Sequence, residues 1–188
     1  MIKNNQKIYA FIDSQNLNLG VKNSIVDKKR KINYQGWTVD FRKFYIYLKE
    51  KLKVEKAFIF IGFIEDNQPL YDNLISSGYT LIYKPTLEHT ENGKTIVKGN
   101  VDAELVLHAM IEYNNYDKAV IVSGDGDYHC LVEYLDQQNK LLKICVPNRH
   151  SHSSLLRLYR KYFLFISDLK NKLAYKNKKR GSSLKTEL

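Results

Sequence analysis

Two aspartates share the Ser-Gly-Asp-Gly-Asp-Tyr segment of residues 123–128. The apolar run of residues 119–122 before it is typical of a buried strand, and apolar residues after it repeat with the spacing of one helical face. Asp125 and Asp127 therefore lie at a strand-to-helix turn, where Gly124 and Gly126 are expected to provide backbone conformations that other residues resist. In the structural interpretation, Asp125 or Ser123 caps the helix and Asp127 favours the positive end of its dipole. In the chemical interpretation, the two carboxylates are ligands for a hard cation.

Two more aspartates hold comparable positions. Asp13 directly follows the apolar run of residues 8–12, and Asn16 comes three residues later. Asp102 opens a predicted helix just after Lys98, at the head of a column of apolar residues. A carboxylate at the head of a core-facing column is costly unless it has a partner. The simpler alternatives are a polar turn after Asp13 and a favourable dipole contact for Asp102, while Glu104 faces another side of the helix.

The elements that must position these side chains alternate regularly along the chain. Buried strands are predicted at residues 8–12, 57–64, 79–83, 119–122 and 141–146, and amphipathic helices separate them. Residues 86–98 are predicted to form a loop or hairpin that turns at residues 92–93, and residues 162–166 a sixth strand or a helix extension. This alternation indicates an α/β fold with a parallel sheet covered by helices on both faces. All strand carboxyl ends then meet at one edge, which is the usual place for a site.

Four carboxylates at one edge repel each other unless a counter-charge is present. No Lys or Arg stands within the segment of residues 123–128 or directly beside Asp13, so a hydrated Mg²⁺ or Mn²⁺ is the simplest counter-charge. Thirty Lys and Arg against twenty Asp and Glu give a formal net charge of +10, which favours a polyanionic partner. An acidic metal pocket in a basic protein suits a phosphodiester backbone. Histidines 150 and 152 lie in a polar loop before a predicted helix at residue 155, where capping is favoured over phosphate contact or metal binding.

Three motifs in this order resemble a known family. They are Asp13-x-x-Asn16, Lys98-Gly99-x-Val101-Asp102 and Ser123-Gly124-Asp125-x-Asp127-Tyr128, and together they are similar to the signature of the NYN domain. That domain belongs to the PIN-like nuclease superfamily, and the segments of residues 36–43 and 70–85 resemble its bacterial LabA-like branch. The resemblance covers residues 7–167.

The resemblance implies a Rossmann-like, three-layer PIN-like fold with a mainly parallel sheet of strand order 3-2-1-4-5, and metal-dependent ribonuclease chemistry. The residues at the acidic, catalytic and metal-binding positions are Asp13, Asp102, Asp125 and Asp127. Asn16 and Ser123 match polar positions that orient substrate or metal-bound water. The chain departs from the branch in the helix after the fifth strand, where Arg160 and Lys161 stand in place of an acid.

The expected partner is RNA, with Mg²⁺ or Mn²⁺ as cofactor, no nucleotide cofactor and no membrane span; a homodimer is left open. The predicted nucleic-acid contacts are Lys28, Lys29, Arg30, Lys31, Lys98, Arg149, Arg157 and Arg160. We predict a nuclease domain at residues 1–168, and a basic, partly disordered tail at residues 169–188. Cys130 and Cys145, each in an apolar segment, are interpreted as reduced core residues of a cytoplasmic protein.

Three functions are consistent with these features. The first is a metal-dependent endoribonuclease that uses metal-activated water. The second is a non-catalytic RNA-binding or regulatory protein that retains the acidic pocket. The third is another acidic Rossmann-like phosphoryl enzyme. It is disfavoured because toprim domains place a Glu where this chain has Asp13, and because haloacid dehalogenases need a second Asp two residues after the first.

Overall fold

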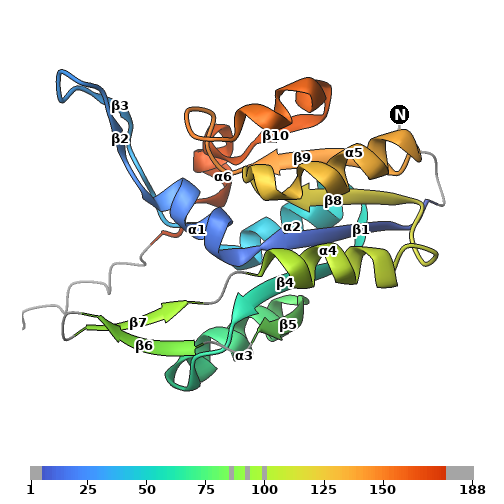
Figure 1. Ribbon diagram of the computed structural model, residues 1–188, viewed down its shortest axis with the longest axis horizontal. Coiled ribbons are helices and arrows are strands. Elements are labelled where there is room, and N and C mark those ends of the chain that lie inside the picture. Colours follow the sequence, from blue (N-terminus) through green and yellow to red (C-terminus); the bar gives the residue numbers. More distant parts are fainter. Residues whose placement is uncertain (1–5, 85–86, 92–93, 99–100, 177–188) are drawn as a thin grey trace, which may run out of the picture.

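A six-stranded parallel sheet forms the centre of the molecule (Figure 1). The computed structural model describes residues 6–84, 87–91, 94–98 and 101–176, with the side chains of residues 87–98 left out. The strand order is β10-β9-β8-β1-β4-β5. The strands are β1 (Ile8–Asp13), β4 (Val54–Gly62), β5 (Thr80–Lys84), β8 (Lys118–Val122), β9 (Leu141–Val146) and β10 (Phe163–Phe165). The predicted order 3-2-1-4-5 is therefore confirmed, with β10 added beside β9.

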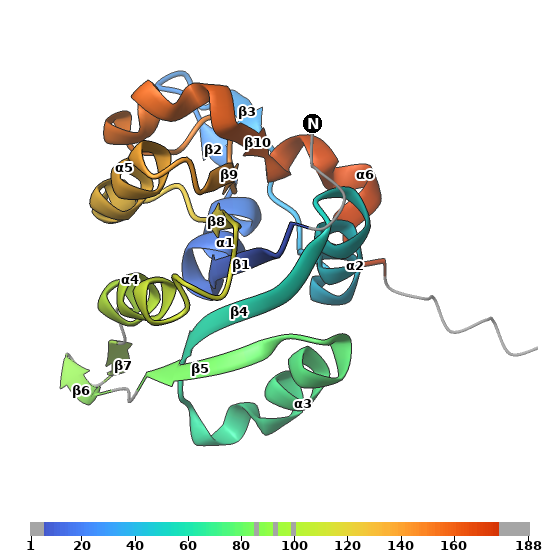
Figure 2. The ribbon, with the colours of Figure 1, turned by 90° about the vertical axis from the view of Figure 1, so that its right-hand side faces the viewer.

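Each face of the sheet has its own hydrophobic core. Every residue of β1 is buried, and its side chains alternate between the two cores as strand geometry requires. Buried side chains of α1 (Ser14–Lys22), α2 (Phe41–Lys51) and α3 (Gln68–Ser77) join one core. Those of α4 (Asp102–Ile111) and α5 (His129–Gln137) join the other. Figure 2 shows α2 and α3 on one side of the sheet and α4 and α5 on the other, which together with the two cores confirms the three-layer architecture.

Local sequence signals fix several helix ends. The carboxylate of Asp40 accepts a hydrogen bond from the Lys43 N–H at 3.1 Å and caps α2. Gly78 ends α3 with a φ of +109°, a left-handed conformation that glycine adopts without a steric penalty. A side chain there would also meet the Tyr45 ring, because a Cβ atom on Gly78 would lie 2.4 Å from its Cζ.

Two antiparallel hairpins lie outside the sheet. β2 (Ile25–Val26) pairs with β3 (Ile32–Tyr34), and this hairpin extends away from the body of the molecule (Figure 1). β6 (Leu87–Glu91) pairs with β7 (Lys94–Lys98), as predicted for this segment. The predicted turn at residues 92–93 lies outside the described residues.

The last part of the fold differs from the sequence prediction in two ways. The segment Ser154–Tyr162 is a 3-10 helix, η3, that kinks at Tyr159, whereas we predicted a regular helix from residue 155. The chain also stays packed beyond residue 168, through the 3-10 helix η4 (Ile166–Leu169) and the short helix α6 (Lys170–Leu173). Leu173 is buried, and the Tyr175 N–H donates to the Thr38 carbonyl at 2.9 Å. Residues 177–188 of the predicted tail lie outside the described residues.

The two cysteines have different environments. Cys145 on β9 is buried, and burial raises the pKa of its thiol to about 12, so that the thiol stays protonated at neutral pH. Cys130 is exposed, which makes the prediction of a core position wrong for this residue. It lies on α5 outside the face formed by the buried Leu131, Val132 and Leu135.

Candidate active site

An open cleft of about 1040 Å³ lies at the carboxyl edge of the sheet. It is bounded by α1, by the start of α4, by the turn after β8 and by the loop after β9. The strand order changes direction between β1 and β8, and such a switch point is where ligands bind in open α/β sheets. We call this cleft the acidic cleft, because its lining includes Asp13, Asp102, Asp125 and Asp127.

Asp13 is the most enclosed of these acids, with 5% of its surface exposed. One of its carboxylate oxygens accepts the Asn16 N–H at 2.9 Å, which caps α1. The other accepts the hydroxyl of Tyr128 at 3.1 Å. Burial raises the pKa of Asp13, and the nearby charges of Asp102 and Asp125 raise it further. Two hydrogen-bond donors therefore hold the buried carboxylate in place, although the negative charges of Asp102 and Asp125 lie nearby.

The turn after β8 presents the two aspartates of the Ser-Gly-Asp-Gly-Asp-Tyr segment. Asp125 accepts the Asp127 N–H at 3.2 Å and so caps the 3-10 helix η2 (Gly126–Tyr128), which leads into α5. The hydroxyl oxygen of Ser123 accepts the Asp125 N–H at 3.1 Å, and Ser123 is 1% exposed. The predicted capping contacts therefore exist, and they hold the two carboxylates at the cleft surface.

The four carboxylates influence one another electrostatically. Asp127 is exposed, yet the charges of Asp125 and Asp102 raise its pKa. The pKa of Asp13 responds to Asp102 and Asp125 in the same direction. Among the described residues that line the cleft, none is Lys or Arg. The described lining thus concentrates negative charge at the cleft.

Glycine serves the turn after β8 differently from our prediction. Gly124 and Gly126 do not have positive φ angles, so backbone conformation does not require glycine at either position. Close packing does require it at Gly126, where a Cβ atom would lie 2.4 Å from the hydroxyl oxygen of Ser153. The loop after β9 can therefore approach the turn and form one wall of the cleft.

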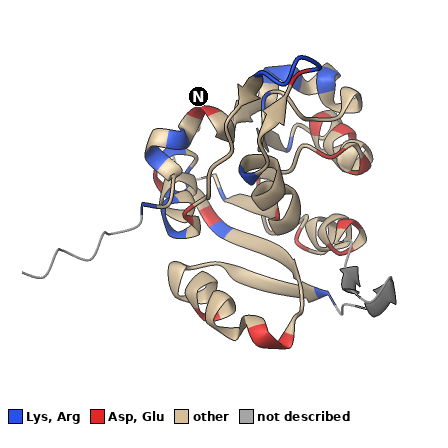
Figure 3. Ribbon diagram, turned by 90° about the vertical axis from the view of Figure 1, so that its left-hand side faces the viewer, with Lys and Arg blue, Asp and Glu red and all other residues tan. Residues whose placement is uncertain are grey.

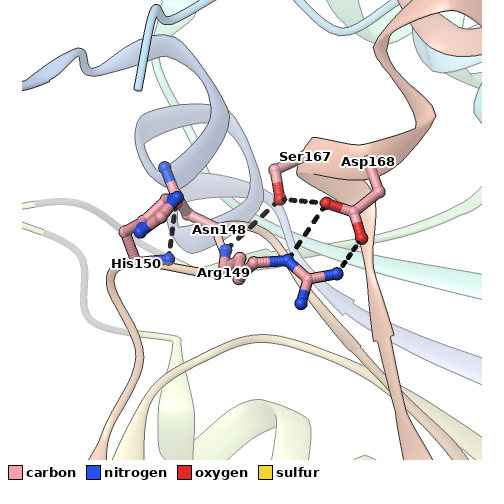
Figure 4. A network of polar contacts seen from close by, with 5 residues as sticks. All are labelled: Asn148, Arg149, His150, Ser167 and Asp168. Carbon is pink, nitrogen blue, oxygen red and sulfur yellow. Dashed lines mark hydrogen bonds and ion pairs between the residues drawn. The ribbon is translucent and has the colours of Figure 1, made fainter. Parts of the chain in front are cut away.

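The start of the loop after β9 is hydrogen-bonded to α1. Asn148 is fully buried, and its side-chain amide donates to the Gly20 carbonyl at 3.0 Å. Its side-chain oxygen accepts the His150 N–H at 2.9 Å (Figure 4). In the same view, the Arg149 N–H donates to the Ser167 hydroxyl at 3.3 Å. This network fixes the loop after β9 against both α1 and η4.

The sequence analysis did not assign two residues to the site, Tyr128, which it placed on a core-facing helix, and His152, for whose loop it favoured helix capping. Tyr128 is buried and bonds Asp13 across 115 positions of sequence, although its spacing indicated only a core position. His152 lines the cleft and packs edge-on against Phe163 at 5.4 Å. Burial lowers the pKa of His152, and the charge of Arg157 lowers it further, so the imidazole is neutral at pH 7. The polar loop was visible in the sequence, but its side-chain directions were not.

The predicted nucleic-acid contacts divide into three groups. Residues 28–31 are exposed between β2 and β3, at the tip of the hairpin, which appears as a blue segment in Figure 3. Arg157 and Arg160 are exposed on η3, close enough to His152 to lower its pKa. Lys98 ends β7, and its side chain lies outside the described residues.

Arg149 is occupied within the protein. Its guanidinium forms an ion pair and two hydrogen bonds with the Asp168 carboxylate (Figure 4). It also lies over the Phe165 ring, 4.4 Å from the ring centroid. Contact with Asp168 raises the pKa of Arg149. This arrangement disfavours the predicted nucleic-acid contact, because a phosphate would have to displace a bidentate carboxylate.

The cleft offers the ligand types of a hard cation but not a closed chelate. Carboxylate and amide oxygens suit Mg²⁺ or Mn²⁺, and the mutual repulsion among the acids favours a cation between them. Yet in the part of the chain that the structure describes, no three His, Cys, Asp or Glu side chains lie close enough to hold a metal ion as they stand. Mg²⁺ is commonly held by one or two carboxylates and several waters, so the residues fit a partly hydrated ion.

Family comparison agrees with the fold. The model of the NYN domain matches residues 7–167. The chain belongs to the NYN domain family. This is a family of PIN-like nucleases, and its members typically are hydrolases that cut nucleic acid and generally use divalent metal ions.

Two relatives are informative at different levels. The Low amplitude and bright protein LabA of Synechococcus elongatus is 33% identical over 107 residues, which are 53% of this chain and 58% of that protein. The chain thus matches little more than half the length of this curated relative. A crystal structure of a protein of unknown function from Vibrio parahaemolyticus has a TM-score of 0.66 at 23% identity. It covers 92% of this chain and 99% of the other, which confirms the fold. Among the described residues, no helix is both long and apolar enough to cross a membrane.

Proposed function

We propose that this protein is a metal-dependent endoribonuclease that hydrolyses RNA phosphodiester bonds within the acidic cleft. The observation that carries the proposal is the gathering of Asp13, Asp102, Asp125 and Asp127 around one cleft at the carboxyl edge. The electrostatic coupling of these acids and the nuclease character of the NYN family both support it. Hydrolysis would break the bond between phosphorus and the 3′ oxygen, leaving a 5′-phosphate and a 3′-hydroxyl.

The four carboxylates are proposed to hold a partly hydrated Mg²⁺ or Mn²⁺, some as direct ligands and the others through its water molecules. A divalent ion bound there would lower the pKa of a water molecule and offset the charge that develops on the phosphate. Asn16 would orient the substrate, because its side-chain oxygen accepts the Gly124 N–H at 2.9 Å and leaves its NH₂ group as a donor at the cleft. We assign Ser123 to positioning, because its buried hydroxyl holds the backbone of Asp125 and does not line the cleft.

The RNA backbone would be held by cations around the cleft. Ile25, in the first strand of the β2–β3 hairpin, lines the acidic cleft, while residues 28–31 lie at the exposed tip. The hairpin could therefore follow a strand that leaves the cleft. Arg157 and Arg160 stand near His152, which lines the cleft from the loop after β9. Cations in these two places would position phosphates without reading sequence.

One observation favours the alternative, a non-catalytic RNA-binding or regulatory protein that retains the acidic pocket. Both oxygens of Asp13 already accept hydrogen bonds, and Asp125 already caps η2. In a non-catalytic protein, these structural contacts alone would explain why aspartates stand at both positions. The alternative predicts RNA binding that does not require Asp125 and no metal-dependent cleavage.

A cleavage assay separates the two functions. End-labelled RNA is incubated with the full chain in Mg²⁺, in Mn²⁺ and in EDTA, beside Asp13→Asn and Asp125→Asn variants. Either substitution is expected to lower metal-dependent cleavage by orders of magnitude while leaving the fold intact. Asp72→Asn is the matched control, because Asp72 is exposed on α3, does not line the acidic cleft and accepts a hydrogen bond from the Gln68 side chain. Cleavage at the parent rate by both site variants would refute the proposed function.

A further inference from the structure

A second hollow, of about 470 Å³, lies at the same edge of the sheet. It is bounded by α1, by α3, by the segment before α2 and by the end of β4. We call it the amide pocket. None of the described residues that line it is charged.

Three side-chain amides stand among these mostly apolar walls, on Gln15, Asn18 and Asn67. Within the described part of the chain, none of the three makes a side-chain hydrogen bond, unlike the amides of Asn148 and Asn16. Apolar contact is provided by residues such as Phe41 and Ile61. The pocket therefore combines unpaired donors and acceptors with surfaces that exclude water.

The two hollows adjoin at the first turn of α1. Gln15 lines both the acidic cleft and the amide pocket, and Asp13 and Asn16 beside it line the cleft. In Figure 1, α1 lies at the carboxyl end of β1, and β4 beside it ends on the same side. A polymer that crosses the acidic cleft can therefore reach the amide pocket, because only Gln15 of α1 separates the two hollows.

We infer that the amide pocket holds one unpaired base of the RNA strand whose backbone crosses the acidic cleft. The inference rests on the proposed function and adds a substrate class, single-stranded RNA. An uncharged pocket does not suit a phosphate, whereas amides pair with base edges and apolar or aromatic walls stack against a base. The volume lies within the range of small-ligand pockets and accommodates a single base. A paired base inside a duplex cannot enter it.

An abasic scan tests this inference by binding, independently of cleavage. The full chain carrying Asp125→Asn keeps the RNA intact in the presence of Mg²⁺. Its affinity is measured by fluorescence anisotropy for a single-stranded 12-mer, for the same strand with one abasic site placed at each position in turn, and for the corresponding duplex. Each strand is also measured with Asn18→Ala and Asn67→Ala added. Gln137→Ala is the matched control, because it removes an exposed amide at the far end of α5.

We expect one abasic position to weaken binding roughly fivefold or more, as loss of a stacked base does. Asn18→Ala should weaken binding to the intact strand several-fold and have no further effect on that abasic strand, and the duplex should bind more weakly than the single strand. An abasic scan that stays flat within twofold would overturn the amide pocket and leave the proposed function standing. The amide pocket would likewise be overturned if Asn18→Ala and Asn67→Ala changed RNA affinity no more than Gln137→Ala does. Absence of RNA binding to any strand would overturn both.

Discussion

Metal binding should stabilise the fold by a measurable amount, and Asp125→Asn should reduce the gain. In the metal-free protein, Asp13 is 5% exposed and lies within electrostatic reach of Asp102 and Asp125. A cation that binds only the folded state relieves this repulsion. At one hundred times its dissociation constant it stabilises the fold by about 2.7 kcal/mol. For a domain of this length, that corresponds to a rise in Tm of roughly 5 to 10 °C.

Asp125→Asn removes one of the four carboxylates proposed to hold the ion but keeps a residue that caps a helix well. If the dissociation constant rises about tenfold, the stabilisation at the same metal concentration falls to about 1.4 kcal/mol, or roughly 3 to 6 °C. Without metal the variant should be slightly more stable than the parent, because Asp125 raises the pKa of both Asp13 and Asp127. The two effects have opposite signs, which a cap alone would not produce.

The assay is a thermal melt of parent, Asp125→Asn and the control Asp72→Asn in Mg²⁺, in Mn²⁺, in EDTA and in NaCl of matched ionic strength. Asp72→Asn should follow the parent in all four conditions, because Asp72 lies on the exposed surface of α3. A parent whose Tm responds to Mg²⁺ and Mn²⁺ no more than to NaCl would refute the metal site. It would also remove most of the support for a nuclease.

Three further predictions concern charge. Asp13→Asn should stabilise the metal-free protein at pH 7, and this gain should shrink in melts as pH falls toward 4. Because the pKa of Asp13 is raised in the folded state, the folded parent binds this proton at a higher pH than the unfolded chain does, and protonation removes the cost of the buried charge. A stability gain that does not change with pH would contradict this prediction. Neutralising three of the lysines and arginines at residues 28–31 should make the slope of log affinity against log salt shallower by about 2 for single-stranded RNA, while Lys49→Gln should leave it unchanged. Arg149→Ala should lower the unfolding free energy by about 1 kcal/mol in denaturant melts through loss of its Asp168 contact, with RNA affinity within twofold of the parent. A large loss of affinity would show that Arg149 leaves Asp168 to bind RNA.

Much of the fold follows from local sequence patterns. Apolar runs such as residues 8–12 and 119–122 end directly at polar residues, so the strand ends could be placed from the sequence alone. The alternation of strands and helices then required a parallel sheet, which brings the carboxyl ends together. The resemblance to the NYN domain added the strand order, which the structure confirms. Asp13, Asp102, Asp125 and Asp127 could be assigned to one edge because each follows a strand or opens a helix.

Contacts between distant parts of the chain depended on the tertiary structure. Tyr128 has the spacing of a core residue, and only the pairing of β8 with β1, which places η2 beside the end of β1, turns its hydroxyl toward Asp13. Arg149 belongs to a basic stretch of sequence, yet Asp168 and Phe165 occupy its guanidinium. The segment after residue 168 is basic, but Leu173 is buried in the same core as the residues of α2, which are more than 120 positions away in the sequence.

The sequence by itself therefore determined which residues can do chemistry and on which edge they lie, because strand and helix periodicity are local properties. The tertiary structure decided which of these residues are available, because availability depends on partners brought together by packing. Gln15 illustrates the division. Its sequence position places it next to the acids, but only the tertiary structure forms a hollow on each side of the first turn of α1, so that Gln15 lines both.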